Sequence, residues 1–279
     1  MAGKESAAGV TILFPDDLKE YIGRHREGSY LLLDVRQPEE YEDNHLPGSK
    51  SIPLPMLASS LGEMDPQKDT IVYCSVGGRS LMAARFLAAR GFARTFQLEG
   101  GIEAWEERTA SGPSELYLQF VRGDESAEEA ARIALGMESG LEQFHRKALE
   151  KSDSPLVRGL LEKLVRAEGS HIEKLRNLLA ELGSNADPPV LAGKMEGGLE
   201  VDDFLRRNES FLQSPHGCLE LAMMIEVQAL DLYLQMAQSS SDKAAREVFF
   251  GLADEEKSHL NSLGELLGKE FAGSEPAKN

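Results

Sequence analysis

The chain has 279 residues, 41% hydrophobic and 28% charged, which is a globular balance and enough length for two cores of moderate size. Its formal net charge of −17 excludes the basic face that a nucleic-acid partner requires. No stretch of about 18 uncharged apolar residues occurs, so no helix is expected to span a membrane. The opening residues lack the apolar run of a secretory signal, and the chain has only two cysteines, which together favour a cytoplasmic location.

Short apolar runs alternate with helical patterns in the first part of the chain. The runs at 29–35, 69–74 and 95–101 predict buried parallel strands, the last of them closed by a glycine turn. Residues 80–91 have helical spacing, and the residues after the last strand predict the start of another helix. Strands that alternate with helices predict an α/β domain with a mainly parallel sheet over residues 1–112.

A cysteine lies in a glycine-containing loop between a predicted strand and a predicted helix. Such a loop can turn successive backbone N–H groups inward, and the helix N-terminus adds positive potential. We therefore expect Cys74 to have a lowered pKa and to act as a nucleophile, with Arg79 adding a fixed positive charge. A cysteine that only packs is the alternative, which the loop, its glycines and its arginine disfavour. The residues expected to form the anion-binding loop are Ser75, Val76, Gly77 and Gly78.

Four separated motifs resemble those of the single-domain rhodanese family and follow the order that the family has. They are LLLDVRQPEEY (31–41), HLPGSKSIPL (45–54), CSVGGRS (74–80) and GFARTFQLEGGIEAW (91–105). The loop from Cys74 to Arg79 is similar in length to that of the sulfurtransferases, whereas the related phosphatases have one residue more. The resemblance implies that Cys74 carries sulfur as a persulfide, from a small sulfur-donor anion to a thiol acceptor. It also implies that Asp34 and Arg36 organise the fold around the loop.

After residue 123 the pattern contains only long amphipathic helices. The small, polar stretch 107–115 marks the domain boundary, residues 113–123 are the expected linker, and residues 270–279 are the expected tail. Four helices joined by a long central crossover predict a ferritin-like four-helix bundle over residues 124–269. The expected helices lie at about 125–151, 155–182, 214–239 and 241–268, with the crossover at 183–213.

Two Glu-x-x-His motifs place both of their side chains on one otherwise apolar helix face. A charged glutamate on an apolar face is costly unless something pairs with it. The same set of residues recurs at an offset of 88 positions, so a bundle would bring all six side chains to one point. That set suits two non-haem iron or manganese ions. A bundle that keeps these residues as buried polar pairs without metal is the alternative. The candidate ligands are Glu138, Glu168, His171, Glu226, Glu256 and His259.

The segment 124–269 resembles the rubrerythrin branch of the ferritin-like superfamily, which implies a di-iron redox centre, a separate electron donor and a homodimer. Tyr233 matches a tyrosine near the metals in that family, and His145 takes its place in the first half of the repeat. Both are candidates for hydrogen bonds to the ligands. The chain departs from the family by having Met223 where an extra glutamate is usual, and by lacking a four-cysteine rubredoxin tail. The second cysteine, Cys218, is expected to pack rather than to react.

The leading hypothesis is an enzyme: a sulfurtransferase that carries sulfur on Cys74, coupled to a di-iron centre that acts on peroxide, oxygen or sulfur species. An alternative is a persulfide carrier or sensor, whose bundle binds iron or mediates dimerisation with little turnover. A third interpretation is an inert bundle that serves self-association alone.

Overall fold

The computed structural model describes residues 4–6, 9–112, 123–151, 155–184 and 200–273. Its contacts divide the chain into two compact units, Met1–Leu116 and Tyr117–Asn279, and each is described by itself. Apart from Gly123, the predicted linker lies outside the described residues, and so does the end of the predicted tail.

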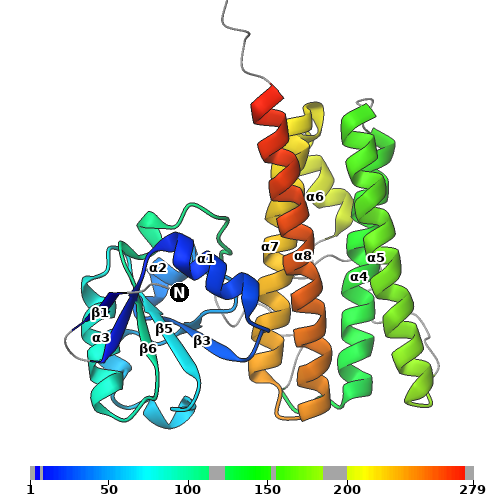
Figure 1. Cartoon of the computed structure of the whole chain (residues 1–279). Coiled ribbons are helices and arrows are strands. Elements are labelled where there is room, and N and C mark those ends of the chain that lie inside the picture. Colours follow the sequence, from blue (N-terminus) through cyan, green and yellow to red (C-terminus); the bar gives the residue numbers. More distant parts are fainter. Residues whose placement is uncertain (1–3, 7–8, 113–122, 152–154, 185–199, 274–279) are drawn as a thin grey trace, which may run out of the picture. The chain divides into compact units, whose positions relative to one another are not determined.

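The N-terminal unit is built on a six-stranded sheet with the strand order β1-β2-β6-β5-β3-β4 (Figure 1). Only β1 is antiparallel to its neighbour, and the other four pairings are parallel, as the alternating pattern predicts. The three predicted strands are β3, β5 and β6, at the centre of the sheet. The other three strands were not predicted, and two of them, β1 and β4, are too short to show a pattern. The strand bounds are Lys4–Ser6 (β1), Val10–Leu13 (β2), Tyr30–Asp34 (β3), Lys50–Ser51 (β4), Asp69–Tyr73 (β5) and Thr95–Leu98 (β6).

Helices flank the sheet on both faces. Helix α3 (Gly78–Ala89) is the predicted one, whereas α1 (Pro15–Arg24) and α2 (Pro38–Asp43) were not predicted. The helix expected after β6 is a short 3-10 helix, Gly101–Ala104, and Trp105 is already extended. The difference has a local cause, because Gly100 and the residue after it both have a positive φ and hold the chain in a tight turn.

The sheet separates two apolar cores because successive side chains of a strand point to opposite faces. Leu33 and Val72 belong to the core that helix α3 covers. Leu32 and Ile71, their neighbours in sequence, belong to the core that α1 covers. Cys74 lies at the edge of the first core, just past the end of β5, so the packed sheet fixes the place where its loop begins.

Four long helices form the C-terminal unit and confirm the all-helical pattern of that segment. Helix α4 packs against α5 and α8, and α7 packs against α8. The short helix α6 lies in the predicted crossover, of which residues 185–199 are outside the described part. Among the described residues, no helix has the length and apolar character to cross a membrane. The bounds are Ala127–Lys151 (α4), Pro155–Glu181 (α5), Val201–Arg207 (α6), Pro215–Ser239 (α7) and Lys243–Gly273 (α8).

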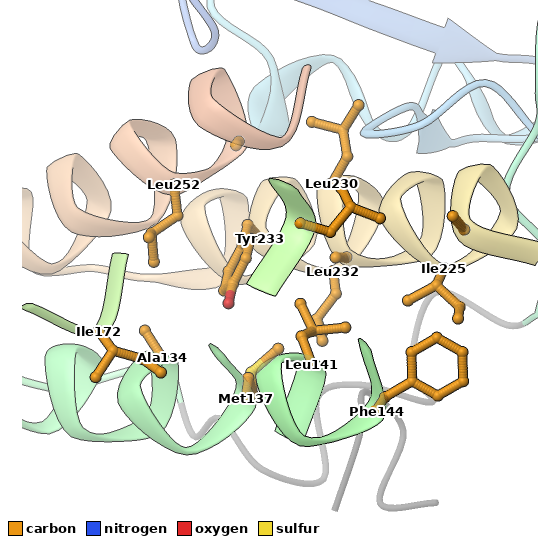
Figure 2. Close-up of a cluster of buried hydrophobic side chains, with 14 of the residues drawn as sticks. Ala134, Met137, Leu141, Phe144, Ile172, Ile225, Leu230, Leu232, Tyr233 and Leu252 are labelled. Atoms are coloured by element: carbon orange, nitrogen blue, oxygen red, sulfur yellow. The ribbon is translucent and has the colours of Figure 1, made fainter. Parts of the chain in front are cut away.

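The space between these helices is filled by aliphatic and aromatic side chains (Figure 2). Leu141 and Phe144 of α4 lie toward Leu232 and Ile225 of α7, and all four are buried. Tyr233 enters the same core and is fully buried, although its phenol carries a polar oxygen. A buried hydroxyl needs a hydrogen-bond partner, so this part of the core contains a polar site.

Candidate functional site

The first candidate site is the loop that joins β5 to α3. Cys74 follows the last residue of β5 and is 1% exposed. Its Sγ accepts a hydrogen bond from the backbone N–H of Gly77 at 3.1 Å, and the Ser80 hydroxyl lies 3.5 Å from the same sulfur. The loop therefore folds back over the sulfur and presents backbone donors to it, as the sequence predicts.

This geometry lowers the pKa of the Cys74 thiol. Burial acts in the opposite direction and raises the pKa, but hydrogen bonds to the sulfur outweigh it. They involve the Ser80 hydroxyl and the backbone N–H groups of Ser80, Gly77 and Val76. Since a backbone N–H interacts more strongly with a thiolate than with a thiol, the loop favours the nucleophilic form.

Two glycines give the loop its shape. Gly77 has a φ of 103°, which a residue with a side chain rarely adopts, and it begins helix α3 as its N-cap. Gly101 has a φ of 61°, and a Cβ there would lie 2.2 Å from the carbonyl oxygen of Cys74. The backbone N–H of Ile102 donates to that same oxygen at 2.8 Å. The turn after β6 thus supports the cysteine loop, and a side chain at Gly101 would collide with the backbone of that loop.

Arg79 is held by a carboxylate that the sequence did not single out. Its two terminal nitrogens donate to the two oxygens of Glu40, each at 2.7 Å. The Ser75 hydroxyl donates to Glu40 as well, at 2.7 Å, and accepts from Arg79 at 2.7 Å. The hydrogen bond from Arg79 lowers the pKa of Glu40, so the pair stays ionised. Arg79 therefore anchors the loop to α2, in addition to the charge that it places near Cys74.

Asp34 and Arg36 form a buried ion pair with 2.7 Å between Oδ2 and Nη2. Arg36 also donates to the side chain and the backbone carbonyl of Asn44. These contacts tie the end of β3 to the segment after α2, which matches the structural role that the sequence implies for the pair.

The second candidate site lies inside the helical unit. The structure brings all six predicted ligands together there, in two groups that share Glu168 and Glu256. Within each group the potential ligand atoms lie within 4.8 Å of one another. One group, called position 1 below, is Glu138, Glu168, His171 and Glu256. The other, called position 2, is Glu168, Glu226, Glu256 and His259.

Both histidines turn Nδ1 toward the carboxylates. His171 Nδ1 lies 3.0 Å from Glu138 and 3.4 Å from Glu168. His259 Nδ1 lies 3.1 Å from Glu256 and 3.4 Å from Glu226. All four glutamates are 0% exposed. Each group therefore offers one ring nitrogen and three carboxylates in the interior of the unit.

The polar atoms at this site lack enough partners within the protein. Both carboxylate oxygens of Glu168, and one each of Glu226 and Glu256, are buried without a hydrogen-bond partner among the described residues. Burial raises the pKa of Glu168 and of Glu256 well above the usual range of a carboxyl. Buried carboxylates that lack donors are costly unless a cation neutralises them. The residues present thus fit a pair of metal ions with mixed oxygen and nitrogen ligands.

Tyr233 and His145 both lie against the carboxylates. The Tyr233 hydroxyl donates to Glu138 at 2.6 Å. His145 Nε2 lies 3.4 Å from Glu226 and 3.9 Å from Glu168, and the residue is 0% exposed. Their placement beside the predicted ligands is what the repeat suggests for them.

Cys218 has none of the features of the first site. It is 1% exposed, and burial raises its pKa to about 11. It remains a thiol at neutral pH and packs in the apolar core of the helical unit.

Sequence reasoning missed several residues at the two sites, because they come from distant parts of the chain. Glu40 approaches Arg79 across 39 positions. Gln97 is buried next to Gly77 but belongs to β6, whereas the cysteine loop follows β5. Glu255, which contacts His171, stands next to a predicted ligand, yet nothing in the sequence separates it from an ordinary surface carboxylate.

Comparison with known proteins concerns the N-terminal unit. Residues 15–108 match the family described as Rhodanese-like domain. The chain is 36% identical over 80 residues to the thiosulfate sulfurtransferase GlpE of Pseudomonas syringae, covering 29% of this chain and 76% of that protein. A protein of Allochromatium vinosum named Sulfurtransferase is 33% identical over 75 residues, 27% of this chain and 70% of its own. The chloroplastic rhodanese-like/PpiC domain-containing protein 12 of Arabidopsis thaliana is 41% identical over 78 residues, and the chain spans 26% of its length.

Solved structures include similar chains. A rhodanese-like domain protein from Staphylococcus aureus is 26% identical, with a TM-score of 0.34, over 36% of this chain and 96% of its own. A rhodanese-related protein from Thermoplasma volcanium is 30% identical, with a TM-score of 0.32, over 35% of this chain and 95% of its own.

We expect Gly101→Ala to destabilise the N-terminal unit more than Gly91→Ala. Both glycines have a positive φ, which costs a side chain about 1–2 kcal/mol. Only at Gly101 would the new Cβ also meet the backbone of the cysteine loop, whereas nothing lies within 4 Å at Gly91. Urea unfolding followed by the fluorescence of Trp105, the single tryptophan of the chain, reports on this unit. Equal losses from both substitutions would show that the turn does not support the loop.

We expect Cys74 to be alkylated by iodoacetamide at a lower pH than an ordinary thiol. The thiolate is the reacting form, so the rate falls as the pH drops through the pKa, and a lowered pKa moves that fall to lower pH. Ser80→Ala removes one of the stabilising contacts and should move the midpoint upward. Mass spectrometry of the separate peptides gives Cys218 as an internal control, with a midpoint near pH 11. A Cys74 midpoint unchanged by Ser80→Ala would contradict this account.

Proposed function

The chain belongs to the rhodanese-like family through residues 15–108, and on that basis we propose that its N-terminal unit is a sulfurtransferase with Cys74 as the sulfur carrier. The observation that carries the proposal is the set of backbone N–H groups and the Ser80 hydroxyl gathered around Sγ. These donors stabilise the thiolate before the reaction and remain in place for the negative charge of a persulfide.

The transfer takes place in two displacements. The Cys74 thiolate attacks the outer sulfur of an anion such as thiosulfate, a new S–S bond forms, and the old S–S bond breaks with its electron pair leaving on sulfite. An acceptor thiolate, or cyanide, then attacks the outer sulfur of the persulfide, and Cys74 leaves as a thiolate. The chain is unchanged at the end of the cycle, so sulfur transfer at Cys74 needs no redox cofactor.

We further propose that the helical unit is ferritin-like and holds two non-haem iron or manganese ions. Support comes from the two overlapping ligand groups and from the buried oxygens that lack partners. Glu168 and Glu256 belong to both groups and would hold both ions, whereas each of the other four side chains would hold one ion. When bound, such ions supply one-electron chemistry toward peroxide, oxygen or sulfur species.

The burial of Cys74 favours a second candidate function. A sulfur atom in a residue that is 1% exposed has little contact with bulk solvent. Such a site also suits a carrier or sensor that keeps its persulfide for one partner. Slow turnover of thiosulfate and cyanide together with a persulfide that survives purification would favour the carrier over the enzyme.

We expect Cys74→Ser to abolish sulfur transfer, because a hydroxyl cannot act as the sulfur acceptor at neutral pH. The rate of thiosulfate:cyanide transfer should fall to that of the uncatalysed reaction, while the metal content stays unchanged. Cys218→Ser is the matched control and should keep the full rate, since that thiol has a pKa of about 11. Full activity in Cys74→Ser would show that the loop is not the sulfur site.

We expect Glu168→Ala to lower the metal content, because it removes a ligand that belongs to both groups. The wild-type chain, reconstituted anaerobically with iron, should hold about two ions, and hydrogen peroxide should oxidise them rapidly. The variant should retain sulfur transfer. The control is Glu162→Ala, which removes an exposed carboxylate from the same helix. A wild-type chain that takes up neither iron nor manganese would contradict the proposed metal centre.

A further inference from the structure

The two halves of the helical unit supply equivalent ligands. Adding 88 to the number of each ligand in the first half gives the ligand in the second half, and Glu168 and Glu256 exchange roles between the two groups. If the surroundings followed the same rule, positions 1 and 2 would be equivalent and would bind a metal ion equally. The side chains that contact the ligands from outside do not follow the rule.

The first difference concerns the histidines. His171 Nδ1 faces the carboxylates of position 1, and its Nε2 lies 2.8 Å from Glu255. Glu255 is in turn held by Lys174, whose Nζ lies 2.8 Å from the same oxygen. The repeat places Ala167 and Ser262 at the counterparts of these two residues. Accordingly, among the described residues, no carboxylate contacts Nε2 of His259.

The second difference concerns Glu138 and Glu226, the two carboxylates that each belong to one position only. Tyr233 donates to Oε1 of Glu138 at 2.6 Å, so the other oxygen of Glu138 is left to face His171 at 3.0 Å. The counterpart of Tyr233 in the repeat is His145. It approaches Oε1 of Glu226 at 3.4 Å, but that oxygen has no hydrogen bond within the described residues. At position 1, contacts with neighbouring side chains thus fix Glu138 and His171. Their counterparts at position 2, Glu226 and His259, are held less firmly.

We propose that the two positions bind metal unequally, that position 1 takes the first ion, and that Glu255 is the positioning residue responsible. A carboxylate that accepts from the outer nitrogen of a ligating histidine fixes its ring and makes the inner nitrogen a better donor. Preorganised ligands also lose less conformational freedom when an ion binds. The inference rests on the proposed metal centre and deepens it, because it assigns the order in which that centre fills.

The test is a manganese titration of the full chain, freed of metal, followed by electron paramagnetic resonance. With one equivalent of Mn²⁺, unequal positions give chains with a single ion and the six-line signal of an isolated Mn²⁺. The signal of a coupled pair then grows with the second equivalent. Glu255→Leu should weaken the first binding step about 10- to 100-fold, a typical loss for an outer-shell partner. Coupled pairs should then appear already at one equivalent, beside empty chains.

Two further variants keep the test informative. Glu255→Gln preserves the shape and one acceptor oxygen but loses the charge, so it should lie between the wild type and Glu255→Leu and should fold even where the leucine variant does not. Glu173→Gln removes an exposed carboxylate near His171 and should change nothing. Coupled pairs from the first equivalent in the wild type, or equal affinities in Glu255→Gln and the wild type, would overturn the unequal filling while leaving the metal centre intact. No binding of Mn²⁺ at all would overturn both.

Discussion

Buried negative charge is the constraint on which both units depend. A thiolate or carboxylate removed from water costs several kcal/mol unless donors or cations replace its hydration. In the N-terminal unit the backbone meets this cost, because Gly77 adopts a positive φ and the loop can direct its N–H groups at one sulfur atom. The sheet below fixes the start of the loop, and the turn at Gly101 fixes its course. The nucleophilic form of Cys74 therefore depends more on the backbone fold than on any charged side chain.

The helical unit cannot stabilise buried negative charge with backbone N–H groups. Within a long helix the backbone N–H groups are already bonded to the preceding turn, so none remains for a side chain in the core. The four fully buried glutamates have three histidines and one tyrosine as close polar neighbours: His171, His259, His145 and Tyr233. The remaining demand for positive charge is one that the two proposed divalent ions would meet. The same physical requirement thus leads to an anion-binding loop in one unit and to a cation site in the other.

The sequence predicts the parts of this protein that repeat a short pattern. The central strands show continuous apolar runs, helix α3 and the four long helices show helical spacing, and the 88-residue offset identifies all six candidate ligands. Strands β1 and β4 were missed because two or three residues carry no pattern, and β2 was missed although it is as long as β6. Glu40 and Glu255 were missed for another reason: each acts through contacts with residues far away in the chain. Such contacts depend on how elements pack, and no local pattern encodes them.

The comparison of the two halves separates what the proposed metal centre would require from what would adjust it. Both halves provide the same glutamate and Glu-x-x-His set, so the repeat retains the groups that would touch the ions. The outside contacts differ at each counterpart pair, Tyr233 with His145 and Glu255 with Ala167. If the ligands were only buried polar residues that fill space, one half would have no reason to match the other in ligands while differing around them. This pattern supports the proposed centre, since equal ligands would allow two ions to bind and unequal surroundings would let each behave differently.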